Sequence, residues 1–230
     1  LEQGYLTWAP SDAITLTMGR FLAPIGWELL DPNEMYQFSH AHVFNYGIAT
    51  AHTGLMLSAA AGDMFDISVY FTNASDTFYE VDIPKALGTR IGLTFGDANV
   101  GLSAIYDHKA ATIIDIDATY AADSLTIGFE GNVGIDDASG DIWAGSLLMA
   151  NFGLTDDVAL TIRGDYFFDP ASIDRVGVAY INDEQYISGT ISPSYAITDN
   201  AGMLLEYKAT YRVDAGETDH LTALEATYSF

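Results

Sequence analysis

Apolar and polar residues alternate along most of this chain, in runs separated by short polar turns. Successive side chains of a β-strand face opposite sides of a sheet, so a period of two predicts strands rather than helices. The pattern predicts thirteen strands, near Tyr5–Trp8, Ala13–Arg20, Gly54–Ala61, Phe65–Asn73, Gly88–Phe95, Asn99–Asp107, Thr112–Tyr120, Leu125–Val133, Ile142–Phe152, Leu160–Phe168, Tyr186–Tyr195, Met203–Arg212 and Leu221–Phe230.

A short turn that carries Asp recurs between these runs. It stands at Ser11-Asp12, Gly62-Asp63, Gly96-Asp97, Ala122-Asp123, Thr155-Asp156-Asp157 and Thr198-Asp199-Asn200. Between consecutive turns there is room for a strand, a connection of variable length and a returning strand. One rim of the sheet is therefore expected to have tight turns and the other longer loops, as in bacterial outer-membrane barrels.

The two faces of these strands differ sharply in charge. One series, from Phe65, Ile67 and Val69 through to Tyr228 and Phe230, has thirty-eight positions and no charged residue. The opposite series carries Asp66, Arg90, Asp107, Asp115, Asp117, Glu130, Arg163, Asp165, Glu206, Lys208, Arg212 and Glu225. A barrel in lipid needs one uncharged face outside and a polar face inside, so these twelve residues are predicted to line a pore.

Alternation alone does not separate a membrane barrel from a soluble one, whose apolar face fills the interior. Three features favour the membrane form: thirteen strands are too many for side chains to fill, half of the few bases share the inner face with carboxylates, and aromatics stand at strand ends. The predicted lipid-interface aromatics are Phe95, Tyr120, Phe152, Tyr195, Tyr228 and Phe230.

The predicted fold is thus all-β, a transmembrane antiparallel up-and-down β-barrel of about 14 strands (12 to 14), with residues 1–230 forming a single domain. Short turns are expected on the periplasmic side and longer loops on the extracellular side. Because single-chain bacterial barrels have an even number of strands, we expect either a further strand before Leu1 or an error in the count. Pro193, inside a predicted strand, is expected to mark a bulge.

Composition narrows the function further. The formal charge of −24, with only 8 Lys and Arg, argues against nucleic acid as a partner, because phosphate binding depends on those bases. The absence of Cys excludes disulfides and thiolate chemistry. No apolar run is long and uninterrupted enough for a membrane-spanning helix. The chain begins at Leu1 with no visible signal peptide, so we expect a mature or partial product.

The longest connection, about residues 21–53, contains Trp27, Glu28, Asp31, Glu34, His40 and His42. One interpretation is a constriction loop that folds into the lumen, where its carboxylates favour cations. The other is a loop packed on the rim or against a neighbouring subunit.

Enzymatic and metal sites are not predicted. Ser, His and Asp are scattered without the spacing of a nucleophile and its base, so we expect no enzyme and no cofactor. His40, His42 and His52 could in principle bind a metal, and the acidic loops calcium, but none has the spacing of a known site. We therefore predict no metal ligands.

Two segments resemble known proteins. The closing run Leu221–Phe230 ends on an aromatic, as outer-membrane barrels do. The long connection resembles the first long loop of the OmpL-like β-barrel porin family at Gly19-Arg-Phe21, Gly26-Trp-Glu28, Asn33, Ser39 and His52-Thr-Gly54. Residues 1–8 resemble the strand that precedes that loop in the family. Ala49 stands where that family often has proline, and the chain is shorter than typical members. The resemblance implies a general porin of the outer membrane, with no catalytic residues.

Three functions follow as hypotheses. The first is a passive channel for small hydrophilic solutes or ions that weakly prefers cations, embedded in outer-membrane lipid as a homo-oligomer, with a trimer implied by the porin class. The second is a structural or surface-assembly barrel plugged by its first loop. The third is a soluble ligand-binding β-barrel.

Overall fold

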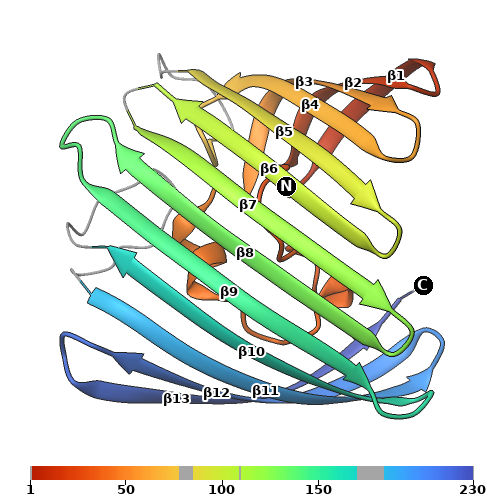
Figure 1. Ribbon diagram of the computed structural model, residues 1–230, viewed down its shortest axis with the longest axis vertical. Coiled ribbons are helices and arrows are strands. Elements are labelled where there is room, and N and C mark those ends of the chain that lie inside the picture. Colours follow the sequence, from red (N-terminus) through yellow and green to blue (C-terminus); the bar gives the residue numbers. More distant parts are fainter. Residues whose placement is uncertain (1, 78–84, 109, 170–183, 230) are drawn as a thin grey trace.

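The computed structural model describes residues 2–77, 85–108, 110–169 and 184–229. Within these residues the chain forms one antiparallel sheet in which each strand pairs with the next along the sequence (Figure 1). The strands are β1 (Gly4–Ser11), β2 (Ile14–Leu22), β3 (Ala51–Ala61), β4 (Phe65–Asn73), β5 (Lys85–Phe95), β6 (Ala98–Asp107), β7 (Ala111–Ala122), β8 (Leu125–Asp136), β9 (Ile142–Gly153), β10 (Val158–Asp169), β11 (Glu184–Thr198), β12 (Ala201–Arg212) and β13 (Glu217–Tyr228).

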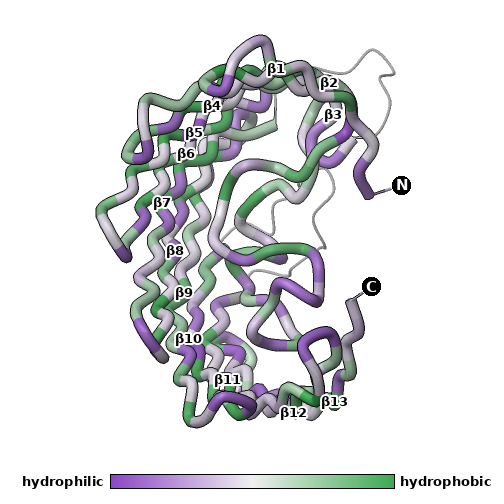
Figure 2. Tube along the Cα trace, turned by 90° about the vertical axis from the view of Figure 1, so that its right-hand side faces the viewer, coloured by the Kyte–Doolittle hydropathy of each residue, from purple (hydrophilic) through white to green (hydrophobic). Residues whose placement is uncertain are grey.

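All thirteen predicted strands are confirmed, and the up-and-down order is the predicted one. The sheet curves strongly, so that β1 and β13 lie on either side of an opening while the middle strands form the opposite wall (Figure 2). No pairing joins β1 to β13 among the described residues. The recurrent Asp-bearing turns all lie at one rim, since each connects an odd-numbered strand to the following even-numbered one.

Pro193 interrupts one ladder without forming the bulge that we expected there. Pairing between β11 and β12 stops at Ile191 with Tyr207 and resumes in the same register at Ser194 with Leu204. Proline has no N–H to donate, so the ladder loses a bond while the strand path is unchanged. The register shift in this pair lies further on, between Ala196 and Thr198.

The orientation of the side chains is that of a membrane barrel. On the apolar series, Ile162 is 46% exposed and Leu224 is 71% exposed, whereas Arg163 on the opposite series is 1% exposed. An apolar outer surface is stable only against hydrocarbon, because in water it would leave large contiguous patches uncovered. The soluble barrel, which needs the reverse orientation, is therefore excluded.

Aromatic side chains mark both rims of this apolar surface. Five of the six predicted interface aromatics, Phe95, Tyr120, Phe152, Tyr195 and Tyr228, are exposed and stand beside the short turns. The sixth, Phe230, lies outside the described residues. A second set, which the sequence analysis did not single out, stands near the long-loop rim, at Phe71, Tyr106, Tyr166 and Tyr211.

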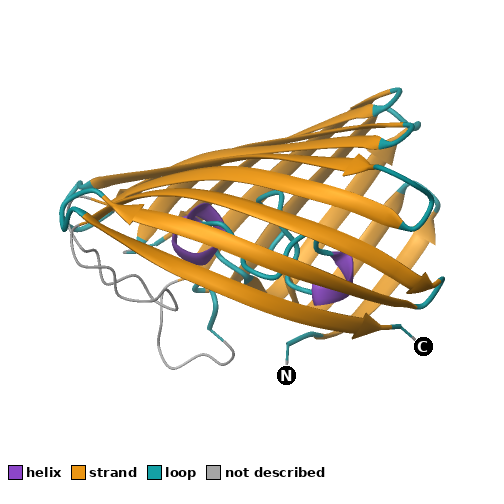
Figure 3. Ribbon diagram, turned by 90° about the horizontal axis from the view of Figure 1, so that it is seen from below, coloured by secondary structure: helices purple, strands orange, loops and turns teal. Residues whose placement is uncertain are grey.

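The first long connection, residues 23–50, is called loop 1 below. It is shorter at both ends than the predicted loop because Phe21 and His52 belong to β2 and β3. It contains a short 3-10 turn, η1 (Pro32–Glu34), and a single π-helical turn, η2 (Val43–Gly47). Both lie within the concave side of the sheet (Figure 3). No helix in the described ranges is long and apolar enough to cross a membrane.

Candidate pore and its inserted loop

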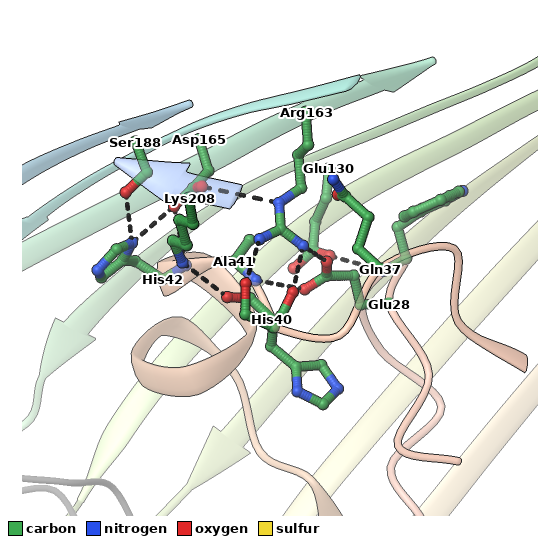
Figure 4. Close-up of polar contacts among 12 residues, drawn as sticks. Glu28, Gln37, His40, Ala41, His42, Glu130, Arg163, Asp165, Ser188 and Lys208 are labelled. Carbon is green, nitrogen blue, oxygen red and sulfur yellow. Dashed lines mark hydrogen bonds and ion pairs between the residues drawn. The ribbon is translucent and has the colours of Figure 1, made fainter. Parts of the chain in front are cut away.

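Loop 1 folds against the inner face of the sheet, and buried ion pairs hold it there (Figure 4). Arg163 of β10 donates to Oε1 of Glu28 at 2.5 Å and to the carbonyl oxygen of Ser39 at 2.6 Å. The other carboxylate oxygen of Glu28 accepts from the backbone N–H of Ala41 at 2.7 Å. Charge-assisted bonds in a poorly solvated site are stronger than those at a surface, so this cluster fixes both halves of the loop.

Next to this cluster, His42 binds Asp165 of β10. The backbone N–H of His42 donates to Oδ1 of Asp165 at 3.0 Å, and its ring Nδ1 lies 2.6 Å from the same atom. Burial lowers the pKa of His42, and the positive charges of Lys208 and Arg163 lower it further, while Asp165 opposes them. Nζ of Lys208 donates to the carbonyl oxygen of His40 at 3.0 Å, which ties the same segment to β12.

Ser188 of β11 completes a trio that the sequence did not predict, because its Oγ lies 3.2 Å from Nδ1 of His42. The residue types are those of a hydrolase triad, but the geometry is different. In a triad the acid binds one ring nitrogen and the serine the other. Here Asp165 and Ser188 contact the same nitrogen, so His42 cannot pass a proton from one to the other. The trio is a packing contact of loop 1.

On the other side of loop 1, β7 and β8 supply carboxylates to its backbone. The N–H of Gly26 donates to Asp115 at 3.3 Å, and the N–H of Trp27 donates to Glu130 at 2.7 Å. The indole N–H of Trp27 reaches Thr119 at 2.8 Å. Gly26 has a φ of 85°, and a Cβ there would press on Ile48 and the Glu130 carboxylate, so only glycine suits this bend.

Two further contacts attach the middle of loop 1 to β11 and β12. The side-chain amide of Gln37 donates to Ser192 at 3.2 Å, and the N–H of Ser39 lies 3.2 Å from both oxygens of Glu206. Glu206 has no exposed surface. Ser103 of β6 donates to the carbonyl oxygen of Pro24, and the indole N–H of Trp143 of β9 donates to that of Gly47, both at 3.3 Å. Loop 1 therefore forms hydrogen bonds with every strand from β6 to β12, and its backbone N–H groups bind several carboxylates of this wall.

Loop 1 also packs against β5 and β6, through a buried apolar cluster that includes Ile25, Ala86 and Ile105. Arg90 of β5 pairs with Asp117 of β7, with one N–O distance of 2.8 Å, and its side chain keeps 20% of its surface exposed. Two cavities, of about 360 Å³ and 240 Å³, share the loop residues Gly26, Glu28 and Leu29 in their linings, and Arg90 lines both.

Of the twelve predicted pore residues, loop 1 contacts Asp115, Glu130, Arg163, Asp165, Glu206 and Lys208 directly. Arg90 and Asp117 line the larger cavity beside the loop, and the other four lie apart from it. Asp66 is exposed near the short turns, and Glu225 is partly exposed on β13. Asp107 is buried and accepts from the N–H of Ser75 at 2.7 Å. Arg212 pairs with Glu217 and Asp219 at the long-loop rim.

The predicted constriction residues are divided in the same way. Trp27, Glu28 and His42 face the wall, whereas Asp31 caps η1 and Glu34 is exposed. His40 stacks on Phe44, with ring centroids 4.1 Å apart. Within the described ranges there is no group of three or more His, Cys, Asp or Glu placed to hold a metal ion.

These features define a class: a β-barrel of the bacterial outer membrane with an inward-folded loop in a charged lumen, as in porins. The sequence matches the family described as "Putative beta-barrel porin-2, OmpL-like" over residues 1–227, so the chain belongs to that family. The resemblance drawn from loop 1 is thereby confirmed and extends over nearly the whole chain. The family places the protein in the bacterial outer membrane.

Solved structures of outer-membrane proteins share the fold. The anion-selective porin from Comamonas acidovorans has a TM-score of 0.72 at 10% identity, over 98% of this chain and 77% of that one. OmpT of Vibrio cholerae has a TM-score of 0.63 at 14% identity, over 95% and 77%. OprD of Pseudomonas aeruginosa has a TM-score of 0.61 at 12% identity, over 94% and 66%. No curated protein matches the sequence. The family is described as one of porins, which are channels.

Proposed function

We propose that the protein is a passive diffusion channel for small hydrophilic solutes or ions, with a weak preference for cations. The supporting observation is the charge of the inner face, where eight carboxylates (Asp66, Asp107, Asp115, Asp117, Glu130, Asp165, Glu206, Glu225) stand with four bases (Arg90, Arg163, Lys208, Arg212). A lumen of net negative charge concentrates cations and repels anions.

The preference is weak because much of this charge is internally paired. Arg163 neutralises Glu28, and Arg90 neutralises Asp117. The remaining field comes from carboxylates on the wall and from exposed acids of loop 1 such as Glu34. The path that we propose passes through the two cavities beside loop 1, with Arg90 common to both.

Single-channel recording in planar bilayers tests this function. Purified protein should give discrete current steps, and in a KCl gradient the reversal potential should have the sign of modest cation selectivity. Heat-unfolded protein from the same preparation is the control. Absence of steps, or clear selectivity for chloride, would contradict the proposal.

A second function has a specific observation in its favour. The hydrogen bonds of loop 1 with seven consecutive strands, β6 to β12, are those of a firmly seated plug, as a structural or surface-assembly barrel would need. Folded, detergent-stable protein that gives no steps in wild type but conducts after Arg163→Met would favour this plugged barrel over the open channel.

We also propose that the barrel is a homo-oligomer, with a trimer as the first expectation from its class. Light scattering of the detergent-solubilised protein, corrected for bound detergent, measures the number of chains. A monomer at all detergent concentrations tested would overturn this part of the proposal.

A further inference from the structure

The larger cavity beside loop 1 has the composition of a ligand site. Its walls include Trp27, Glu34, Tyr36, Gln37 and Asp117, together with other residues of the loop and of β5 to β9. Its volume of about 360 Å³ lies within the range of small-molecule sites in proteins. The cavity belongs to the lumen, so a solute inside the barrel has access to it.

An aromatic surface forms one side of this cavity. The rings of Trp27 and Tyr36 are stacked, with centroids 6.1 Å apart and an angle of 17° between their planes. Trp27 lies against the wall at Gly128, where a Cβ would overlap its indole ring, and its N–H is bound to Thr119. Tyr36 is 38% exposed. The indole thus serves as a rigid backing, and Tyr36 presents the aromatic surface that is open to a ligand.

Two hydrogen-bond acceptors in the lining have no donor in the described part of the chain. Gln37 is 3% exposed, and its amide N–H₂ is used by Ser192, while its Oε1 has no hydrogen-bond partner among the described residues. An unpaired buried carbonyl costs free energy that a donor at the cavity wall would recover. The carboxylate of Glu34 is exposed and forms no ion pair in the described part of the chain.

The positive charge that lines the cavity is already neutralised, because Arg90 donates two N–H groups to Asp117. Among the neutral donors, Asn99 donates to Thr94 and the indole N–H of Trp27 donates to Thr119. An anion would therefore meet the carboxylate of Glu34, with no cation among the described residues of the lining that lacks an ion-pair partner. A ligand with several N–H donors and a positive charge would satisfy all of the open groups, because cations also bind favourably to aromatic faces.

We propose that this cavity binds a small organic cation, an amine or guanidinium compound, between the ring of Tyr36 and the carboxylate of Glu34, with an N–H directed to Oε1 of Gln37. This inference rests on the proposed channel function, because the cation reaches the site from the lumen. It also identifies the class of solute that binds inside the pore. The binding itself needs no conduction, so the two proposals are separable.

Isothermal titration calorimetry of the full chain in detergent tests the site, with agmatine as the probe and glutarate as an anion of similar length. Glu34→Gln removes the charge from an exposed side chain and should weaken agmatine binding by about five- to tenfold. Tyr36→Leu removes the ring and should weaken it by a similar factor. Asp31→Asn is the matched control, because Asp31 is an exposed acid of the same loop outside the cavity and the amide keeps its capping oxygen.

The site is supported if agmatine binds, glutarate does not, and only the first two variants lose affinity. It is overturned if agmatine does not bind to wild type, if glutarate binds equally well, or if Asp31→Asn costs as much as Glu34→Gln, which would indicate general charge attraction. A retained heat-modifiable band on electrophoresis confirms folding of each variant. Binding without current steps would refute the channel and not the site, whereas steps without binding would refute the site alone.

Discussion

Arg163 shows how one buried side chain can control a whole loop. Its guanidinium is 1% exposed and bonds to Glu28 and to the backbone of Ser39, which are eleven residues apart in loop 1. Removing one partner of a buried ion pair leaves the other charge without solvation, which costs far more than losing a surface pair.

We therefore expect Arg163→Met to destabilise the docked loop by about 3 to 5 kcal/mol. Hydrogen exchange of the backbone amides of Ala41 and His42, which donate to Glu28 and Asp165, should then become much faster. Arg212→Met is the matched control, since Arg212 is a rim base whose partners are exposed, and its loss should cost about 0 to 1 kcal/mol. Unchanged protection in Arg163→Met would contradict the role given to this ion pair.

His42 should make loop docking depend on pH. Its pKa is lowered in the docked loop, chiefly by burial, so the released loop binds a proton more readily. The docked form is fully favoured above the ordinary value of 6.5 and loses stability as pH falls from there to the lower docked pKa. Below that pKa no further loss from His42 is expected.

The hydrogen-exchange rates of the loop amides are measured in His42→Asn and in wild type at each pH. The ratio of the variant rate to the wild-type rate cancels the intrinsic pH dependence of exchange. That ratio should fall as pH drops below 6.5, because only the wild type is weakened by protonation of His42. A ratio that stays constant across this range would show that His42 does not titrate with docking.

At the scale of the strand, alternation predicts which face a side chain occupies wherever the apolar series is regular. Ile162 and Arg163 are adjacent in sequence, yet one is 46% exposed to the outside and the other is 1% exposed inside. The contacts of loop 1 could not be predicted in this way, because no period relates a loop to its partners. Ser39 and Glu206, for example, are 167 residues apart. The sequence indicated that the loop is unusual, and the curvature of the sheet decides what it touches.

A charge placed on the outward face of β10 should have an effect that depends on depth. Ile162→Arg, near the middle of the strand, should destabilise the barrel by about 2 to 4 kcal/mol, and Tyr166→Arg, near the rim, by about 0 to 1 kcal/mol. Equilibrium unfolding from lipid vesicles in guanidinium chloride measures both. Equal costs at the two positions would argue against a lipid boundary at this face.

Close packing on the inner face should make one glycine irreplaceable. Gly134 of β8 stands opposite Trp143 of β9, and a Cβ there would overlap the indole ring. Gly134→Val should cost about 1 to 3 kcal/mol and reduce the folded fraction. Gly189→Val is the control, because a Cβ at Gly189 on β11 would meet no atom within 4 Å. Heat-modifiability on electrophoresis gives the folded fraction of each variant.

For the whole molecule, the balance of charge should determine selectivity. The field of the inner carboxylates is screened by salt, with a Debye length of about 10 Å at 0.1 M and about 3 Å at 1 M. We expect the cation preference measured by reversal potential to be clear in dilute KCl and nearly absent near 1 M. The preference should also decrease in Glu225→Gln, which removes a partly exposed inner carboxylate away from loop 1. A preference that does not change with salt would point to a narrow sieve instead of a diffuse field.

The order in which the barrel assembles follows from where loop 1 is anchored. The loop emerges after β2, but its partners Asp165, Glu206 and Lys208 belong to β10 and β12, with separations of 123 to 168 residues. Contacts between such distant residues carry a large loop-closure cost and form late in folding. We therefore expect Glu28 and His42 to stay in water until β10 and β12 have joined the sheet, so that loop 1 docks late in maturation.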